Sequence, residues 1–164
     1  MAGWSKPSSA NVFKVNCKGV FDRPKMRGAV AAVMRNHQGK WVKGNAGMMG
    51  LLVPVAAELW SIFYGLKMAW EKGNVKSVFI ESDCLEAVNL INNPDPGFFL
   101  ADLVDMIKAL ESEEWDSCAI VHVPSSSNEA ATALARAYVD GEGGLVDLPR
   151  APAFLQPIID AERM

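Results

Sequence analysis

Two acidic residues lie where strand and helix patterns meet in the sequence, and carboxylates in such positions can bind a ligand or a metal ion. Asp83 follows the apolar run 78–80, which predicts a short buried strand. Glu58 lies in the first turn of a helix that is predicted to begin at Pro54, beside the apolar stripe of that helix. Open α/β sheets often place ligands at the carboxyl ends of buried strands. Glu58 and Asp83 are therefore candidate site residues.

A simpler interpretation exists for each acid. Asp83 is a favourable N-cap for the helix predicted to follow it, and Asp83 with Glu86 three residues on resembles a capping box. Glu58 is also favoured in a first helical turn by the helix dipole. Taken alone, Asp83 is better explained as a cap than as a functional carboxylate.

The other patterns predict one α/β domain that positions these acids. The element order is three strands, a helix, a strand, two helices, a strand, a helix and a tail. Loops are predicted at 19, at 22–27 and at 47–52, and Ser126 with Glu129 could cap the last long helix. The predicted strands are 12–17, 28–34, 40–44, 78–80 and 118–123, and the predicted helices are 54–72, 85–92, 98–110 and 126–138. The first three strands should form an antiparallel meander.

Length and composition limit the protein class. The 164 residues predict a single domain, with 1–11 as a lead-in, 12–140 as the folded body and 141–164 as a tail packed on the same domain. Three separated cysteines without a C-x-x-C pair argue against a zinc site or a disulfide framework. No apolar run is long enough to span a membrane, and the start lacks the apolar core of a signal peptide. We expect a cytoplasmic or nuclear protein with no membrane partner and no small-molecule cofactor.

Charge is distributed unevenly along the chain. Residues 1–45 hold nine of the 16 Lys and Arg residues but one of the 19 acidic residues, so a basic N-terminal third precedes an acidic body. The simplest interpretation is a solvated face on exposed strands. The functional interpretation is a surface for nucleic acid or an acidic partner. The candidate nucleic-acid-binding residues are Lys14, Arg23, Lys25, Arg27 and Lys43.

An ordered set of local patterns resembles the plant ribonuclease H-like domain that is related to the ribonuclease H domain of non-LTR retroelement reverse transcriptases. The patterns are Trp4-x-x-Pro7, Lys14-Val15-Asn16, Arg35-Asn36-x-x-Gly39, Ala57-Glu58-Leu59, Glu81-Ser82-Asp83, His122-Val123-Pro124, Asn128-x-x-Ala131-x-x-Leu134-Ala135 and, in the tail, Asp147-Leu148-Pro149. Each is weak alone, but together they span nearly the whole chain. The resemblance implies a mixed α/β ribonuclease H-like fold. Its five-stranded sheet should have the order 3-2-1-4-5, with the first three strands antiparallel and helices on both faces.

The resemblance also implies a chemistry, which is metal-dependent cleavage of the RNA strand of an RNA–DNA hybrid. In that family four carboxylates hold two Mg²⁺ ions. Glu58 and Asp83 match the second and third carboxylate positions, but Lys18 stands at the first and Thr132 at the fourth. The family's basic residue after Pro124 is also missing, because three serines follow. At an effective dielectric of about 20, an ammonium a few ångströms from Mg²⁺ would cost several kcal/mol.

Three hypotheses follow from these departures. In the first, the domain is a pseudoenzyme that binds nucleic acid or protein and needs no cofactor. In the second, it is a hybrid ribonuclease with weak residual activity and Mg²⁺ held by Glu58 and Asp83. In the third, it is a recognition domain fused into a larger protein, which the position of Trp4 near the start suggests.

Lys18 carries one further prediction. Two neighbouring carboxylates without metal ions repel one another, and an ammonium on a flexible stem can reach both. We therefore expect Lys18 to contact Glu58, Asp83 or both. The alternative is that Lys18 extends to solvent while Asp83 caps its helix, since an exposed ion pair contributes only about 0–1 kcal/mol.

Overall fold

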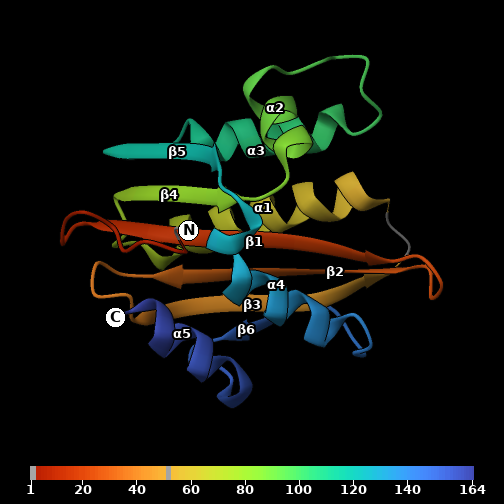
Figure 1. Cartoon of the computed structure of the whole chain (residues 1–164). Helices are drawn as coiled ribbons and strands as arrows, with labels where there is room; N and C mark the ends of the chain where they lie inside the picture. The colour runs from red at the N-terminus through yellow and green to blue at the C-terminus, as the bar shows by residue number, and fades with distance from the viewer. Residues whose placement is uncertain (1–2, 51–52) are drawn as a thin grey trace.

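A single mixed sheet organises the protein, and a computed structural model describes residues 3–50 and 53–164 (Figure 1). Within these residues the sheet has six strands in the order β5-β4-β1-β2-β3-β6. The strands are β1 Val12–Asp22, β2 Arg27–Arg35, β3 Trp41–Gly50, β4 Ser77–Ser82, β5 Ser117–His122 and β6 Val146–Leu148. β1, β2 and β3 are antiparallel, whereas β4 runs parallel to β1 and β5 parallel to β4. The predicted order 3-2-1-4-5 is confirmed.

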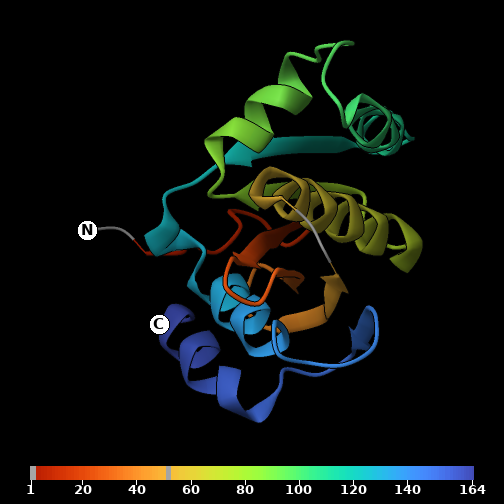
Figure 2. The same ribbon diagram turned by 90° about the vertical axis from the view of Figure 1, so that its right-hand side faces the viewer.

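Helices cover both faces of the sheet, as predicted. The helices are α1 Pro54–Lys72, α2 Leu85–Asn92, α3 Ala101–Glu111, α4 Glu129–Tyr138 and α5 Gln156–Glu162, with short 3₁₀ turns at η1 Ser125–Ser127 and η2 Ala153–Leu155. Figure 2 shows α1 and α3 on one side of the sheet and α4 and α5 on the other. Among the described residues, no helix combines the length and the apolar character that crossing a bilayer requires.

The period of two along each strand decides which side chains meet which helices. In β2, Ala32 and Met34 pack in the core beneath α1, whereas Ala31 and Val33 pack in the core beneath α4. Burial on both faces explains why this strand reads as a continuous apolar run. In β1, Cys17 belongs to the α1 side. Lys18, one residue further on, therefore leaves β1 on the α4 side, and its long side chain reaches Glu58 of α1.

Two strands are longer than their sequence patterns predict. β1 continues through Gly19, which pairs with Val30 although a loop was predicted there. β3 continues to Gly50, so the predicted loop at 47–52 is wrong for residues 47–50, while residues 51–52 lie outside the described part of the chain. Both extensions were missed because strands pair with β2 through backbone hydrogen bonds, which do not need apolar side chains. At Gly47 a Cβ atom would lie 2.6 Å from the carbonyl oxygen of Gly144, so a glycine permits this close approach.

The tail adds a strand and a helix to the domain. β6 pairs antiparallel with β3 and makes the sheet six-stranded rather than five-stranded. Arg35, whose side chain is fully buried, joins the two ends of the chain: its guanidinium donates to Glu162 at 2.7 Å and lies 3.7 Å from the ring centroid of Trp4. Pairing with a carboxylate and an aromatic face offsets part of the cost of burying this charge.

Candidate functional site

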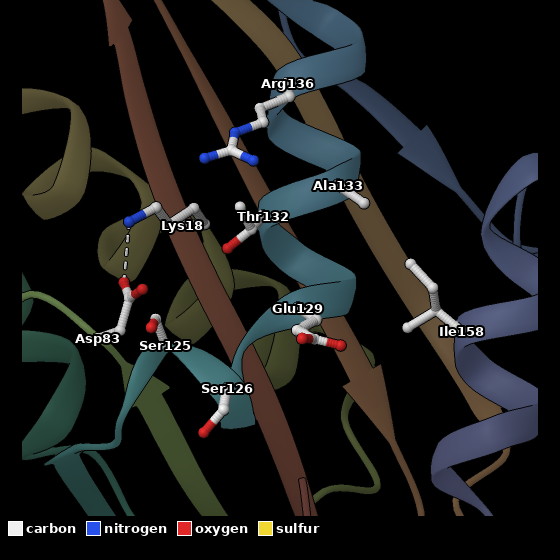
Figure 3. Close-up of a pocket in the computed structure, with 9 residues that line it drawn as sticks. All are labelled: Lys18, Asp83, Ser125, Ser126, Glu129, Thr132, Ala133, Arg136 and Ile158. Carbon is white, nitrogen blue, oxygen red and sulfur yellow. Dashed lines mark hydrogen bonds and ion pairs between the residues drawn. The ribbon is translucent and has the colours of Figure 1, made fainter. Parts of the chain in front are cut away.

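Lys18 bridges the two candidate carboxylates. Its Nζ lies 3.2 Å from Oε2 of Glu58 and 3.0 Å from Oδ1 of Asp83, and it donates a hydrogen bond to each. Figure 3 shows the contact with Asp83. The predicted contact is therefore confirmed, and the alternative in which Lys18 extends to solvent is wrong. The ammonium thus lies between two acids. Lys18 stands at the first of the four positions that hold metal-binding carboxylates in the family that the sequence resembles.

The geometry follows from the pairing of β1 with its neighbours. β1 and β4 are parallel with Cys17 opposite Ser82, so Lys18 and Asp83 come next to each other as both strands continue. On the other side, the backbone N–H of Gly19 donates to Oε1 of Glu58 at 2.6 Å. A Cβ atom at Gly19 would overlap the backbone of Ala57 and Glu58, so this glycine allows α1 to lie directly on β1.

Asp83 does not cap the helix that follows it. The N-cap of α2 is Cys84, and no side chain caps that helix. The predicted capping box of Asp83 with Glu86 is therefore wrong. The physical reason is that an ammonium 3.0 Å away is a stronger partner for the carboxylate than a backbone N–H.

Burial makes the three charges interdependent. The side chains of Lys18, Glu58 and Asp83 are only 18%, 11% and 7% exposed. Burial by itself would lower the pKa of Lys18, but the two carboxylates outweigh burial and the net shift is upward. The stabilisation from charged Lys18 is therefore complete below its ordinary pKa of 10.5 and is lost as the pH rises through the raised value.

Glu58 responds in the opposite way to its surroundings. Burial raises the pKa of its carboxyl above the ordinary 4.5, and Lys18 together with the Gly19 N–H offsets only part of this effect. A carboxyl whose pKa is raised by folding takes up a proton more readily in the folded state. Glu58 is thus an acid that titrates above its ordinary range as the pH falls, while Lys18 stays charged.

A cavity of about 570 Å³ opens beside the bridge. It is lined by Lys18, Asp83, Ser125, Ser126, Glu129, Thr132, Ala133, Arg136 and Ile158. Figure 3 shows Thr132 and Arg136 projecting from α4 toward β1, where Lys18 lies. The hydroxyl of Thr132 donates to the carbonyl oxygen of Asn128 at 3.0 Å, one helical turn back. The positions identified from the sequence are thus brought together, with Thr132 engaged by its own helix.

A buried polar network lies directly behind the site. Asn16 donates to Oε1 of Glu81 and to Oδ1 of Asn128, both at 3.0 Å, and Asn128 donates to the carbonyl oxygen of Cys17 at 2.9 Å. Asn128 is the N-cap of α4, so the predicted cap by Ser126 with Glu129 is wrong. The Asn128 side chain ties α4 to β1 rather than capping its own helix, and this position fixes where Thr132 and Arg136 lie.

The residues at the bridge do not fit a Mg²⁺ site. Mg²⁺ needs several hard oxygen ligands in near-octahedral geometry. Both carboxylates are engaged by an ammonium, and no group of three or more His, Cys, Asp or Glu in residues 3–50 and 53–164 could hold a metal ion. Lys18 stands where a dication would need to approach both acids.

Three of the five predicted nucleic-acid-binding residues, Arg23, Lys25 and Arg27, lie at the β1–β2 turn, whereas Lys14 and Lys43 lie elsewhere. Lys14 pairs with Glu81 at 3.3 Å, and Lys25 pairs with Asp140. Lys43 lines a cavity beside α1, whereas Arg23 lines a cavity beside α4. Arg136, which the sequence argument missed, lines the same cavity as Arg23. From the sequence, Arg136 is recognisable only as an arginine on the polar face of the last long helix. The fold places it beside the site.

The arrangement of strands and helices is that of the ribonuclease H fold, and comparisons with known proteins agree. The family model described as "Reverse transcriptase-like" matches residues 16–138, which is most of the chain. The chain therefore belongs to the reverse transcriptase-like family of ribonuclease H-like domains. The matched region contains Lys18, Glu58, Asp83 and Thr132.

A similar sequence and two similar structures illustrate the likeness. "Putative ribonuclease H protein At1g65750" of Arabidopsis thaliana is 32% identical over 139 residues, which cover 82% of this chain and 22% of that protein. This chain thus corresponds to a minor part of that relative's length. RNase H1 from Halobacterium salinarum superposes with a TM-score of 0.71 at 19% identity, covering 80% of this chain and 99% of that one. LC11-RNase H1 in complex with an RNA/DNA hybrid superposes with a TM-score of 0.70 at 15% identity, covering 78% and 96%. At these identities the structural likeness shows the fold alone.

Proposed function

We propose that this domain is a non-catalytic ribonuclease H-like module that binds a nucleic-acid or protein partner without a metal ion. The observation that carries the proposal is the Lys18 ammonium within hydrogen-bond distance of both Glu58 and Asp83. An ammonium there offsets the repulsion between the acids that a pair of metal ions would otherwise offset. The two acids therefore have an internal cation without any metal ion, which favours a binding role over catalysis.

The missing carboxylates support the same conclusion. Two-metal hydrolysis depends on ions that activate water and stabilise the leaving oxygen. Lys18 cannot act as a ligand while it is charged, and the Thr132 hydroxyl is bonded to Asn128. The competing proposal is weak residual ribonuclease activity through Glu58 and Asp83. It would require the ammonium to leave both acids.

The first test is a cleavage assay. Purified protein with Mg²⁺ or Mn²⁺ is expected to release no product from a labelled RNA–DNA hybrid above a no-enzyme background, because the acids are occupied by Lys18. An active ribonuclease H assayed in parallel supplies the positive control. Metal-dependent cleavage that disappears in Glu58→Gln or Asp83→Asn protein would show that the residual-activity proposal is correct instead.

The second test restores the missing carboxylates. The double variant Lys18→Asp, Thr132→Asp places acids at all four positions and removes the internal cation, so it is expected to bind Mg²⁺ measurably by isothermal titration calorimetry while the parent chain does not. Recovery of cleavage is a stricter demand, because catalysis depends on accurate positioning. The single variant Thr132→Asp retains Lys18 and serves as the control. Equal Mg²⁺ binding by the parent chain and the double variant would contradict the role of Lys18.

A further inference from the structure

A second cavity of about 360 Å³ lies beside the site, between the end of β1 and the end of α4. It is lined by Val20, Phe21, Asp22, Arg23, Pro24, Arg136 and Val139. Arg136 lines this cavity and also the larger one that contains Lys18 and Asp83. Arg136 thus forms part of the wall of both hollows, and we refer to the surface along α4 from the bridge to the β1–β2 turn as the track.

The charges at this end of the track are unequal. Four basic residues, Arg23, Lys25, Arg27 and Arg136, lie here with two acids, Asp22 and Asp140. Lys25 pairs with both acids, with its Nζ 4.0 Å from Oδ2 of Asp22. Neither Arg23 nor Arg136 forms an ion pair with any residue in the described ranges 3–50 and 53–164. Two guanidinium groups are thus left available on the walls of one cavity.

The opposite end of the track is unsuitable for an anion. Glu129 and Arg136 are seven residues apart on α4, which is about two turns, and Figure 3 shows them at opposite ends of the cavity wall. Glu129 lies near Ser126, whereas Arg136 lies one turn further along α4 than Thr132. A negatively charged ligand should therefore approach from the Arg136 end and remain clear of Glu129.

We propose that this track binds the backbone of a nucleic-acid strand, with Arg136 and Arg23 contacting phosphates directly and without a metal ion. The inference rests on the proposed function, and it names nucleic acid as the partner. Guanidinium groups match phosphate oxygens with two parallel hydrogen bonds. A strand held by two such contacts would pass over the β1–β2 turn and past the occupied Lys18 bridge, so it would be bound and left intact.

The test is a binding titration in EDTA, using fluorescence anisotropy of labelled RNA–DNA hybrid, single-stranded RNA and single-stranded DNA. Arg136→Gln and Arg23→Gln are each expected to weaken binding about fivefold or more at low salt, and each should reduce the slope of log K against log salt by about one. Lys72→Gln, which removes one exposed charge from the end of α1 on the other face of the sheet, is the matched control. It should change affinity less than twofold.

Arg136→Lys adds a second criterion. This variant keeps the charge but loses the planar fork, so it should retain the salt slope of the parent chain while binding more weakly. Arg136 is exposed, and unchanged melting temperatures would confirm that these variants remain folded. Equal effects of Arg136→Gln and Lys72→Gln would overturn the proposal. So would the absence of binding to any of the three nucleic acids at low salt, or displacement by polyglutamate as readily as by nucleic acid, which would indicate an acidic protein partner.

The binding titration and the cleavage assay test the two proposals independently. If the parent chain cleaves hybrid and Arg136→Gln still weakens binding selectively, the non-catalytic function is wrong and the phosphate track stands. If nothing is cleaved and the Arg136 variants bind like the parent chain, the track is wrong and the non-catalytic function stands.

Discussion

Replacing Lys18 with methionine is expected to lower the free energy of unfolding by about 3 kcal/mol at pH 8, because removal of one partner from a largely buried ionic cluster leaves the other charges uncompensated. Glu58 and Asp83 would then face each other with the Gly19 N–H as the one remaining partner recorded for either carboxylate in the described residues. Urea denaturation at fixed pH measures the change. Methionine keeps the apolar stem of lysine, so the loss reports the charge and not a cavity.

The stability loss of Lys18→Met should depend on pH. Burial already raises the pKa of Glu58 above 4.5, and loss of the neighbouring ammonium raises it further. A carboxyl whose folded pKa exceeds its unfolded value loses stability as the pH rises from the unfolded toward the folded value. The deficit of Lys18→Met should therefore be largest at pH 8 and shrink toward pH 5. Added Mg²⁺ should restore part of it at pH 8.

Lys67→Met provides the matched control for this experiment. Lys67 pairs with Glu71 at 3.1 Å on the surface of α1, where the two side chains are 46% and 58% exposed. An exposed pair of this kind contributes about 0–1 kcal/mol, so its loss should be small and should not respond to Mg²⁺. If Lys18→Met unfolds like Lys67→Met at every pH, with and without Mg²⁺, then Lys18 is not the internal counter-ion.

The substitution Gly19→Ala is expected to destabilise the protein by about 3 kcal/mol through overpacking. A Cβ atom at this position would overlap the backbone carbonyl of Ala57 and the backbone nitrogen of Glu58, and backbone atoms cannot move aside as a flexible side chain can. β1 and α1 must then separate, which also lengthens the bond from the Gly19 N–H to Glu58. Thermal and urea denaturation measure the loss.

Gly144→Ala is the control for the glycine experiment. A Cβ atom at Gly144 meets nothing within 4 Å, and the residue does not have a positive φ. The substitution should be neutral or slightly stabilising, because alanine reduces the entropy of the unfolded chain. Equal stability of the two variants would mean that β1 and α1 are not in the close contact described.

Much of the site was predictable from the sequence. The α/β class follows from hydrophobic periodicity, whereas the strand order and the matched positions of Glu58, Asp83, Lys18 and Thr132 follow from the resemblance that the ordered motifs carry. The contact of Lys18 with both acids was also predictable, since two close carboxylates without a metal need a cation and no other basic residue lies at the matched position.

Local pattern fails where distant segments supply the decisive partner. Sequence proximity favoured Asp83 as a helix cap, but β1 brings a lysine from 65 residues away, and a charged partner outcompetes a local N–H. Gly19 was predicted in a loop, yet pairing with β2 keeps it in a strand. Arg136 looked like an ordinary solvated residue on a helix, and its place beside Arg23 arises because the asparagine network docks α4 on β1. The sequence by itself thus determined which residues could meet at the site. The tertiary structure decided which partner each one takes, because hydrogen bonding, burial and charge are shared among segments that are distant along the chain.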